Sequence, residues 1–132
     1  MTDLPFETTV PVRYADHDTL GRVNNAVFAS YLEEARVAFL RDVLEDVVGD
    51  PSFVIANLEI DFLAPVTSGS VDVGLGVAEV SERSFSLEYE VAADGDVVAV
   101  GSTVQVHVDP ETREASALPE DWRDFLAEYR IG

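Results

Sequence analysis

Hydrophobic positions along this chain follow two periods. From Ala26 to about Asp46, apolar residues recur every three or four positions, as on one face of a long α-helix. Elsewhere apolar and polar residues largely alternate, which is typical of half-buried β-strands. The alternation predicts strands at 6–14, 53–62, 71–80, 84–91 and 98–108. A short amphipathic helix is expected after Pro119, with Glu120 and Asp121 in its first turn.

The predicted order of elements is β-α-β-β-β-β-α. Because the long helix and the run of antiparallel strands are segregated along the chain, the predicted class is α+β, with one sheet wrapped around the helix. Pro11 places the first strand at a sheet edge or a bulge. In the second strand, the expected apolar face consists of Val54, Ala56, Leu58, Ile60 and Phe62. Such a sheet leaves a strand edge to cover, which favours oligomerisation.

An acidic, turn-like segment lies between the first strand and the helix. It contains Asp16, Asp18 and Gly21, and it ends at Asn24 and Asn25. Either asparagine is a candidate N-cap, because its side-chain oxygen can accept a hydrogen bond from an amide of the first helical turn. The helix is therefore expected to begin beside the carboxylates.

Length and composition limit the possible classes of function. With 132 residues and no apolar run long enough to span a membrane, one domain covering 1–132 is expected. The N-terminal residues lack the positive charge and apolar stretch of a secretory signal, which favours a cytoplasmic location. Cysteine is absent and the histidines are His17 and His107, so no metal or other cofactor is implied.

The balance of charge is the most unusual feature of the composition. The chain carries 26 acidic residues against 8 basic ones, all arginine, for a formal net charge of −18. Self-repulsion on this scale weakens the folded state in dilute buffer, whereas about 1 M salt shortens the screening length to roughly 3 Å. The composition resembles that of a halophilic cytoplasmic protein. It also argues against nucleic acid and anionic membrane surfaces as partners.

One stretch carries a resemblance to a known family. The residues from Arg13 to Arg36, RYADHDTLGRVNNAVFASYLEEAR, resemble the start of the 4-hydroxybenzoyl-CoA thioesterase-like acyl-CoA thioesterases of the hot-dog fold. Matching stretches occur at 60–66, 83–85, 108–109 and 118–120. The resemblance implies hydrolysis of an acyl-CoA to a free acid and CoA, by subunits that pair their sheets edge to edge and hold active sites at the dimer interface. A homodimer or homotetramer is therefore expected.

The resemblance also assigns catalytic roles. Asp18 matches the family's catalytic aspartate, which acts as a nucleophile on the thioester carbonyl or as a general base toward water. A backbone amide at the helix start, at Asn25 or Ala26, matches the oxyanion donor, where the helix dipole adds positive potential. Glu33 is a minor rival to Asp18, because another hot-dog clade places its catalytic carboxylate on the long helix.

The candidate substrate contacts are Arg22, Asn24, Arg83 and Ser84, with the arginines placed to contact CoA phosphates. Many family members have histidine at the position of Arg22. A guanidinium stays protonated at neutral pH, so Arg22 cannot replace that histidine as a base. It could instead hold a phosphate or the Asp16 carboxylate.

Each candidate also has a structural interpretation. Asp18 taken alone would be an ordinary turn residue, and the two asparagines would be helix caps. His17 is expected to face solvent or an interface, and His107 to lie on the polar face of its strand beside Gln105. Two other functions also remain open: a hot-dog hydratase or dehydratase, and a non-catalytic module that binds acyl-CoA.

Overall fold

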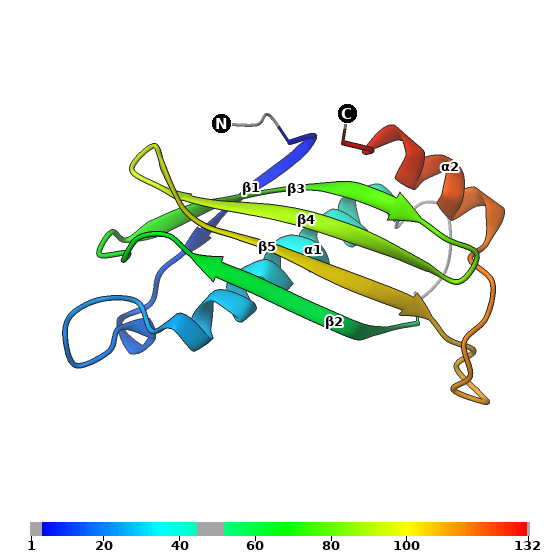
Figure 1. Ribbon diagram of the computed structural model, residues 1–132, viewed down its shortest axis with the longest axis horizontal. Coiled ribbons are helices and arrows are strands. Elements are labelled where there is room, and N and C mark those ends of the chain that lie inside the picture. Colours follow the sequence, from blue (N-terminus) through cyan, green and yellow to red (C-terminus); the bar gives the residue numbers. More distant parts are fainter. Residues whose placement is uncertain (1–3, 45–51, 132) are drawn as a thin grey trace.

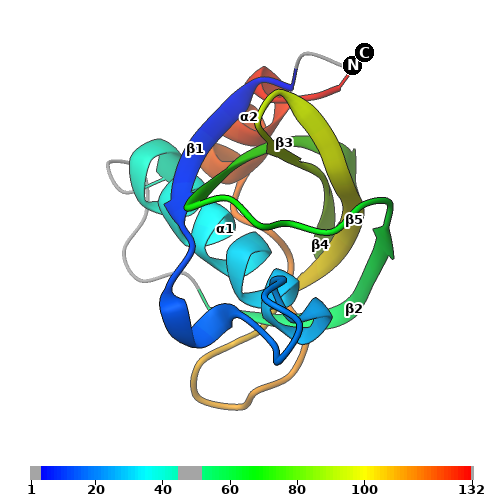
Figure 2. The same ribbon diagram turned by 90° about the vertical axis from the view of Figure 1, so that its left-hand side faces the viewer.

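A five-stranded antiparallel sheet curves around one long helix (Figures 1 and 2). The computed structural model describes residues 4–44 and 52–131. The elements are β1 (Phe6–Pro11), α1 (Phe28–Leu44), β2 (Phe53–Phe62), β3 (Ser70–Val80), β4 (Ser84–Ala93), β5 (Asp96–His107) and α2 (Glu120–Glu128). The strand order β1-β3-β4-β5-β2 leaves β1 and β2 at the edges of the sheet. The predicted α+β class and element order are therefore confirmed.

Helix α1 buries one face against the sheet. Its buried side chains recur with helical spacing at Phe28, Tyr31, Leu32, Ala35 and Phe39. The helix begins two residues later than predicted, because Asn25–Val27 forms a 3₁₀ turn ahead of it. The predicted end at Asp46 lies outside the described residues.

Strand β1 is shorter than its sequence pattern predicted. It pairs with β3 as far as Pro11, at the edge where a proline is tolerated. Beyond Pro11, the carboxylate of Asp16 accepts hydrogen bonds from the amide and the guanidinium of Arg13, at 2.9 and 3.2 Å. These bonds fold Tyr14–Asp16 into a 3₁₀ turn, so the strand does not continue to Tyr14.

A β-bulge decides which side of β2 faces the core. The pairing of β2 with β5 shifts register between Ile55 and Asn57, which reverses the inward and outward positions along the strand. Phe53 and Ile60 consequently both pack against the core, although they stand an odd number of positions apart. The prediction of one uninterrupted apolar face is wrong: of its members, Ile60 packs against the core, whereas Val54, Leu58 and Phe62 are exposed.

The core-facing side of β5 is partly polar. Thr103 and Gln105 are fully buried and belong to a hydrogen-bonded series that starts at the Tyr89 hydroxyl, 2.7 Å from Thr103 Oγ1. It ends where Gln105 Nε2 donates to the Phe85 carbonyl at 3.0 Å. Arg36 on α1 donates to the Tyr89 hydroxyl at 3.3 Å, which joins the helix to the series. Because these buried groups are paired, their desolvation is compensated.

The polar face of β5 is therefore turned inward, and His107 lies among aromatic rings. Its imidazole is 5.8 Å from the Phe53 ring and 5.4 Å from the Trp122 ring, measured between centroids. Trp122 is buried on α2, which starts at Glu120 with Pro119 at the N-cap rather than at the predicted first helical position. These contacts fix α2 against the end of the sheet where β2 begins.

Candidate active site

A buried carboxylate anchors the segment between β1 and α1. Asp16 is only 2% exposed, and its Oδ2 accepts hydrogen bonds from the Arg13 amide and the Tyr31 hydroxyl, both at 2.9 Å. Burial alone would raise the pKa of Asp16, but bonds from the Arg13 amide, the Tyr31 hydroxyl and the Arg13 guanidinium outweigh it and hold this pKa below its ordinary value. The Asp16 carboxylate, which the sequence suggested as one possible contact of Arg22, is therefore held by Arg13 instead.

Asp18 lies at the start of a tight turn that closes on itself. Its amide donates to the Arg22 carbonyl at 2.7 Å, and Gly21, in the left-handed region at φ 78°, donates to the Asp18 carbonyl at 3.1 Å. Asp18 Oδ1 accepts the amides of Leu20 and Arg22 at 2.8 and 3.2 Å. These two bonds lower the pKa of Asp18, so the carboxylate is ionised at neutral pH.

The two asparagines before the helix differ in what they do. Asn24 Oδ1 accepts the Ala26 amide at 2.9 Å, so Asn24 caps the turn that leads into α1. The Ala26 amide is therefore occupied. The Asn25 amide, the first of the turn, makes no hydrogen bond within the described residues, as is usual for the first amides of a helix.

A pocket of about 470 Å³ opens between this loop and the end of β2. Four predicted site residues line it together: Asp18, Arg22, Asn24 and Asn25. Its remaining walls are mostly apolar and come from Val23, Phe28, Phe62, Leu63, Ala64 and Pro65. The Phe28 and Phe62 rings meet edge to face, 5.3 Å apart. The sequence pattern assigned both rings to the core only, because the approach of β2 to the helix start leaves no local signal.

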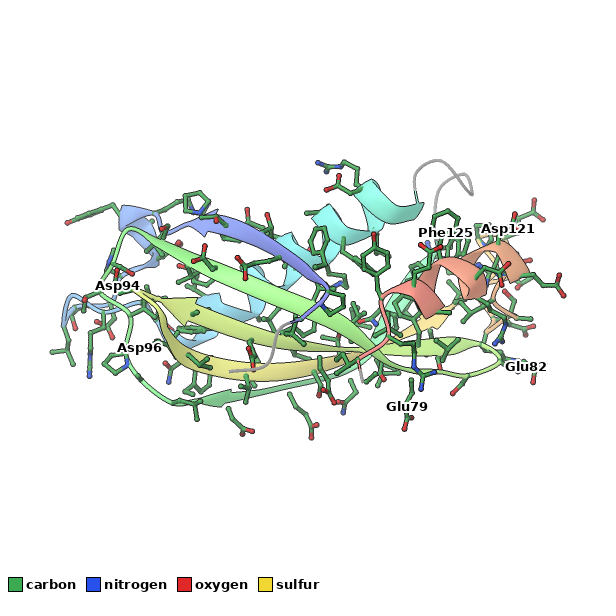
Figure 3. The ribbon with its side chains drawn as sticks, turned by 90° about the horizontal axis from the view of Figure 1, so that it is seen from above. Glu79, Glu82, Asp94, Asp96, Asp121 and Phe125 are labelled. Atoms are coloured by element: carbon green, nitrogen blue, oxygen red, sulfur yellow. The ribbon has the colours of Figure 1, made fainter. Side chains whose placement is uncertain are left out.

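The other two predicted contacts, Arg83 and Ser84, do not line this pocket. Arg83 lies in the β3–β4 turn, next to Glu82, at the end of the sheet opposite the Asp94 turn (Figure 3). Its carbonyl accepts the His107 amide, and His107 pairs with Phe53, so Arg83 is level with the start of β2. The pocket is level with the other end of this ten-residue strand, roughly 30 Å away at about 3.3 Å per residue.

The remaining candidates lie outside the pocket. Glu33 is exposed on α1 and lines a different groove, and His17 directs Nδ1 toward the Tyr14 carbonyl oxygen, 3.3 Å away.

Within residues 4–44 and 52–131, no group of three or more potential ligand side chains is arranged to hold a metal ion. In the same residues, neither helix combines the length and hydrophobicity needed to cross a bilayer.

Comparison with known proteins identifies the family. The model of the thioesterase-like superfamily matches residues 12–126, which include the whole pocket. The chain belongs to this superfamily. The predicted hot-dog fold and the predicted class of enzyme, a thioesterase, are thereby confirmed.

Individual relatives cover nearly the whole chain. A 1,4-dihydroxy-2-naphthoyl-CoA hydrolase from Synechococcus elongatus is 28% identical over 133 residues, with 96% of each chain covered. The crystal structure of a thioesterase from Thermus thermophilus complexed with coenzyme A and Zn is 35% identical, covers 94% of this chain and 98% of that one, and has a TM-score of 0.82. A 1,4-dihydroxy-2-naphthoyl-CoA thioesterase from Synechocystis is 26% identical, with coverages of 93% and 96% and a TM-score of 0.79.

Proposed function

We propose that this protein hydrolyses an acyl-CoA thioester in the pocket beside Asp18. One observation carries the proposal: Asp18, whose carboxylate is ionised, and Asn25, whose helix-start amide is unoccupied within the described residues, line one pocket whose remaining walls are mostly apolar. Thioester hydrolysis needs both groups, one to supply electrons to the carbonyl carbon and one to stabilise the oxyanion that results. The apolar walls suit an acyl group.

Asp18 can act in either of two ways. As a nucleophile, the carboxylate attacks the carbonyl carbon, the C–S bond breaks, CoA leaves as a thiolate, and water then hydrolyses the acyl anhydride. As a general base, it takes a proton from water, the water oxygen attacks the same carbon, and the proton passes to the departing thiolate. Both routes use Asp18 Oδ2, because Oδ1 already accepts two amides and no described residue hydrogen bonds to Oδ2.

The oxyanion is assigned to the Asn25 amide rather than to that of Ala26. The Ala26 amide already donates to Asn24 Oδ1, and breaking that bond would uncap the turn. The Asn25 amide points out of the first turn of the 3₁₀ segment that continues into α1, where the partial positive charge of the helix is concentrated. Asn24 thus contributes indirectly, by holding the turn in shape.

Strand β2 supplies a dimer interface in the proposal. It is an edge strand with exposed apolar side chains at Val54, Ile55, Leu58, Phe62 and Leu63. An exposed edge of this length and hydrophobicity needs a partner. A second copy can pair with it antiparallel about a twofold axis at the middle of the strand, which joins the two sheets into one.

This pairing brings the scattered site residues together. It sets Phe62 opposite the partner subunit's Phe53. The partner subunit's Arg83 lies level with these residues at the start of β4, two strands beyond β2 in the partner's sheet. The distance from Phe62 to the partner subunit's Arg83 is then three strand spacings of about 4.8 Å, or roughly 14 Å. The distance to Arg83 of the same chain is roughly 30 Å. The partner subunit's Arg83 and Ser84 are then within reach of an extended CoA molecule whose thioester lies at Asp18. Arg22, inside the pocket, is the second cation available for its phosphates.

An aromatic acyl group fits the proposal best. The Phe62 ring in the pocket wall is 44% exposed and packs edge to face on the buried Phe28 ring, so its exposed side can accept a further ring. Two of the relatives carry the name of 1,4-dihydroxy-2-naphthoyl-CoA as their substrate. The acyl group of that compound is a substituted naphthalene, so aromatic acyl-CoAs are the first substrates to assay.

The test is a thiol-release assay in molar salt with aromatic and aliphatic acyl-CoAs, together with a separate assay for hydration of an enoyl-CoA. Thiol release with the acid as the second product supports the proposal. Hydration without thiol release would indicate a hydratase. Saturable binding without either reaction would indicate a binding module.

A further inference from the structure

We infer that Arg22 is a further catalytic residue, whose guanidinium stabilises the CoA thiolate as the C–S bond breaks. Among the described residues that line the pocket, Arg22 alone carries a positive charge. The sequence suggested the CoA phosphates or the Asp16 carboxylate as its partner, and Asp16 is held by Arg13. The inference rests on the thioester hydrolysis proposed above and names the group that acts on its leaving thiolate.

The turn fixes the backbone of Arg22 beside Asp18. The Arg22 carbonyl accepts the Asp18 amide at 2.7 Å, and the Arg22 amide donates to Asp18 Oδ1 at 3.2 Å. The next residue, Val23, is buried and donates its amide to the Val66 carbonyl at 2.9 Å. The main chain is therefore held on both sides, and the Arg22 side chain starts from a fixed point in the pocket lining.

The Arg22 guanidinium lies near the Asp18 carboxylate without pairing with it. The pKa of Asp18 is lowered first by the Leu20 and Arg22 amides and further by the positive charge of the Arg22 side chain. No carboxylate of the described residues forms an ion pair with Arg22. The guanidinium is thus close to Asp18 and free of a competing carboxylate, so a thioester that reaches Asp18 also comes close to Arg22.

The reaction places a negative charge on sulfur. When the C–S bond breaks, its electron pair moves to the sulfur atom, which leaves as a thiolate. A guanidinium N–H can donate a hydrogen bond to this thiolate, but the group keeps its own proton because its pKa is above about 12. On the general-base route, the proton that Asp18 took from water passes to the sulfur. On the nucleophile route, solvent supplies that proton and regains one when water hydrolyses the anhydride.

The charge of the whole chain makes a cation at this place more important. With a formal net charge of −18, the field of the protein opposes the negative charge that develops on sulfur. In about 1 M salt the screening length is roughly 3 Å, so distant cations no longer offset this field. A donor in direct contact with the sulfur still does.

The CoA phosphates are the alternative partner of Arg22. The pantetheine arm separates them from the sulfur, so with the thioester at Asp18 they lie toward the partner subunit's Arg83. A thioester of N-acetylcysteamine keeps the sulfur end of that arm and has no phosphate. It therefore distinguishes a contact with sulfur from a contact with phosphate.

The experiment measures kcat/KM for two thioesters of one aromatic acid, one with N-acetylcysteamine and one with thiophenol, whose thiol is more acidic. Arg22→Gln removes the charge and keeps the backbone bonds of the turn. With the N-acetylcysteamine thioester we expect a loss of about 10²-fold, the scale for removing one donor to a developing anion. With the thiophenol ester we expect a much smaller loss, because a more stable thiolate needs less stabilisation.

The matched control is Arg41→Gln, which removes an exposed arginine of α1 that lies outside the pocket. It is expected to keep wild-type kcat/KM with both thioesters. Thermal unfolding of each variant checks that the comparison is made between folded proteins.

Four results would overturn the inference. The first three are wild-type activity of Arg22→Gln toward the N-acetylcysteamine thioester, equal losses with the two thioesters, and a loss confined to acyl-CoA, which would assign Arg22 to the phosphates. The fourth is an equal loss in Arg41→Gln, which would assign the effect to net charge. A wild type that releases no thiol from any thioester would overturn the proposed reaction itself, and the inference with it.

Discussion

The Tyr31 hydroxyl donates a hydrogen bond to Asp16 Oδ2 at 2.9 Å, and both residues are almost fully buried. Tyr31 belongs to α1, whereas Asp16 ends the turn after β1, only two residues before Asp18. The bond therefore ties the segment that carries the proposed catalytic carboxylate to the helix whose start carries the proposed oxyanion donor. It also raises the pKa of Tyr31, after burial of the ring, so this hydroxyl stays protonated and remains a donor.

Asp16→Asn should destabilise the fold. The substitution removes a buried charge that accepts three hydrogen bonds, and a loss of about 1–3 kcal/mol in the free energy of unfolding is expected. Because the native pKa of Asp16 is depressed, its ionisation stabilises the native state above about pH 5, and this contribution is lost on acidification below about pH 4. Urea unfolding at several pH values should show the gap between wild type and variant narrowing with acid. A difference in the free energy of unfolding that stays constant with pH would contradict a stabilising role for ionised Asp16.

Asp18→Asn should abolish most turnover and leave the fold intact. The amide keeps an oxygen for the Leu20 and Arg22 amides but removes the charge, so a loss of about 10²–10⁴-fold in kcat is expected, with little change in Tm. Asp109→Asn is the matched control, because Asp109 Oδ1 also accepts two backbone amides, which likewise lower its pKa, and it lies outside the pocket. Near-normal turnover in Asp18→Asn, with loss in Glu33→Gln, would move the role to the helix.

Two impaired variants, assayed at a substrate concentration well below KM, should complement each other if the site is shared between subunits. Arg83→Ala should weaken CoA binding and raise KM. When Asp18→Asn and Arg83→Ala chains are co-expressed, each mixed dimer contains one site with both changes and one with neither. Activity should therefore reappear above that of either variant alone. Without recovery in purified mixed dimers, Arg83 does not serve the partner subunit's pocket.

Because this chain has Arg22 where many family members have histidine, the pH profile of kcat/KM should lack the titration that a histidine would cause. Asp18 is ionised above about pH 4 and a guanidinium stays protonated, so kcat/KM should be flat between about pH 5 and 8. Arg22→His should introduce a new limb near pH 6.5, while Arg22→Lys, which keeps a charge, should leave the profile flat. A limb between about pH 5 and 8 in the wild type would contradict this prediction.

Salt should stabilise the protein. With 26 acidic residues against 8 arginines, mutual repulsion falls as KCl screens it, so Tm and turnover are expected to rise from dilute buffer to about 1–2 M KCl. Thermal unfolding and thiol release across a KCl series would test this. A Tm that is high in dilute buffer and unaffected by KCl would remove the halophilic interpretation.

The sequence by itself determined the elements, their order and the family. Local periodicity was sufficient to predict α1 and the strands. The motif from Arg13 to Arg36 was sufficient to indicate a thioesterase and to single out Asp18, because a short contiguous segment supplies both the acid and the helix start.

Only the tertiary structure decided which faces and which distant residues meet. The bulge before Asn57 reverses β2, and the burial of Thr103 and Gln105 turns the polar side of β5 inward; both depend on pairing between strands far apart in the sequence. The same holds for the wall that Phe62 contributes to the pocket and for the separation of Arg83 from Asp18. Alternation of residue types specifies two faces of a strand, but the neighbouring strands and the helix determine which of them is buried.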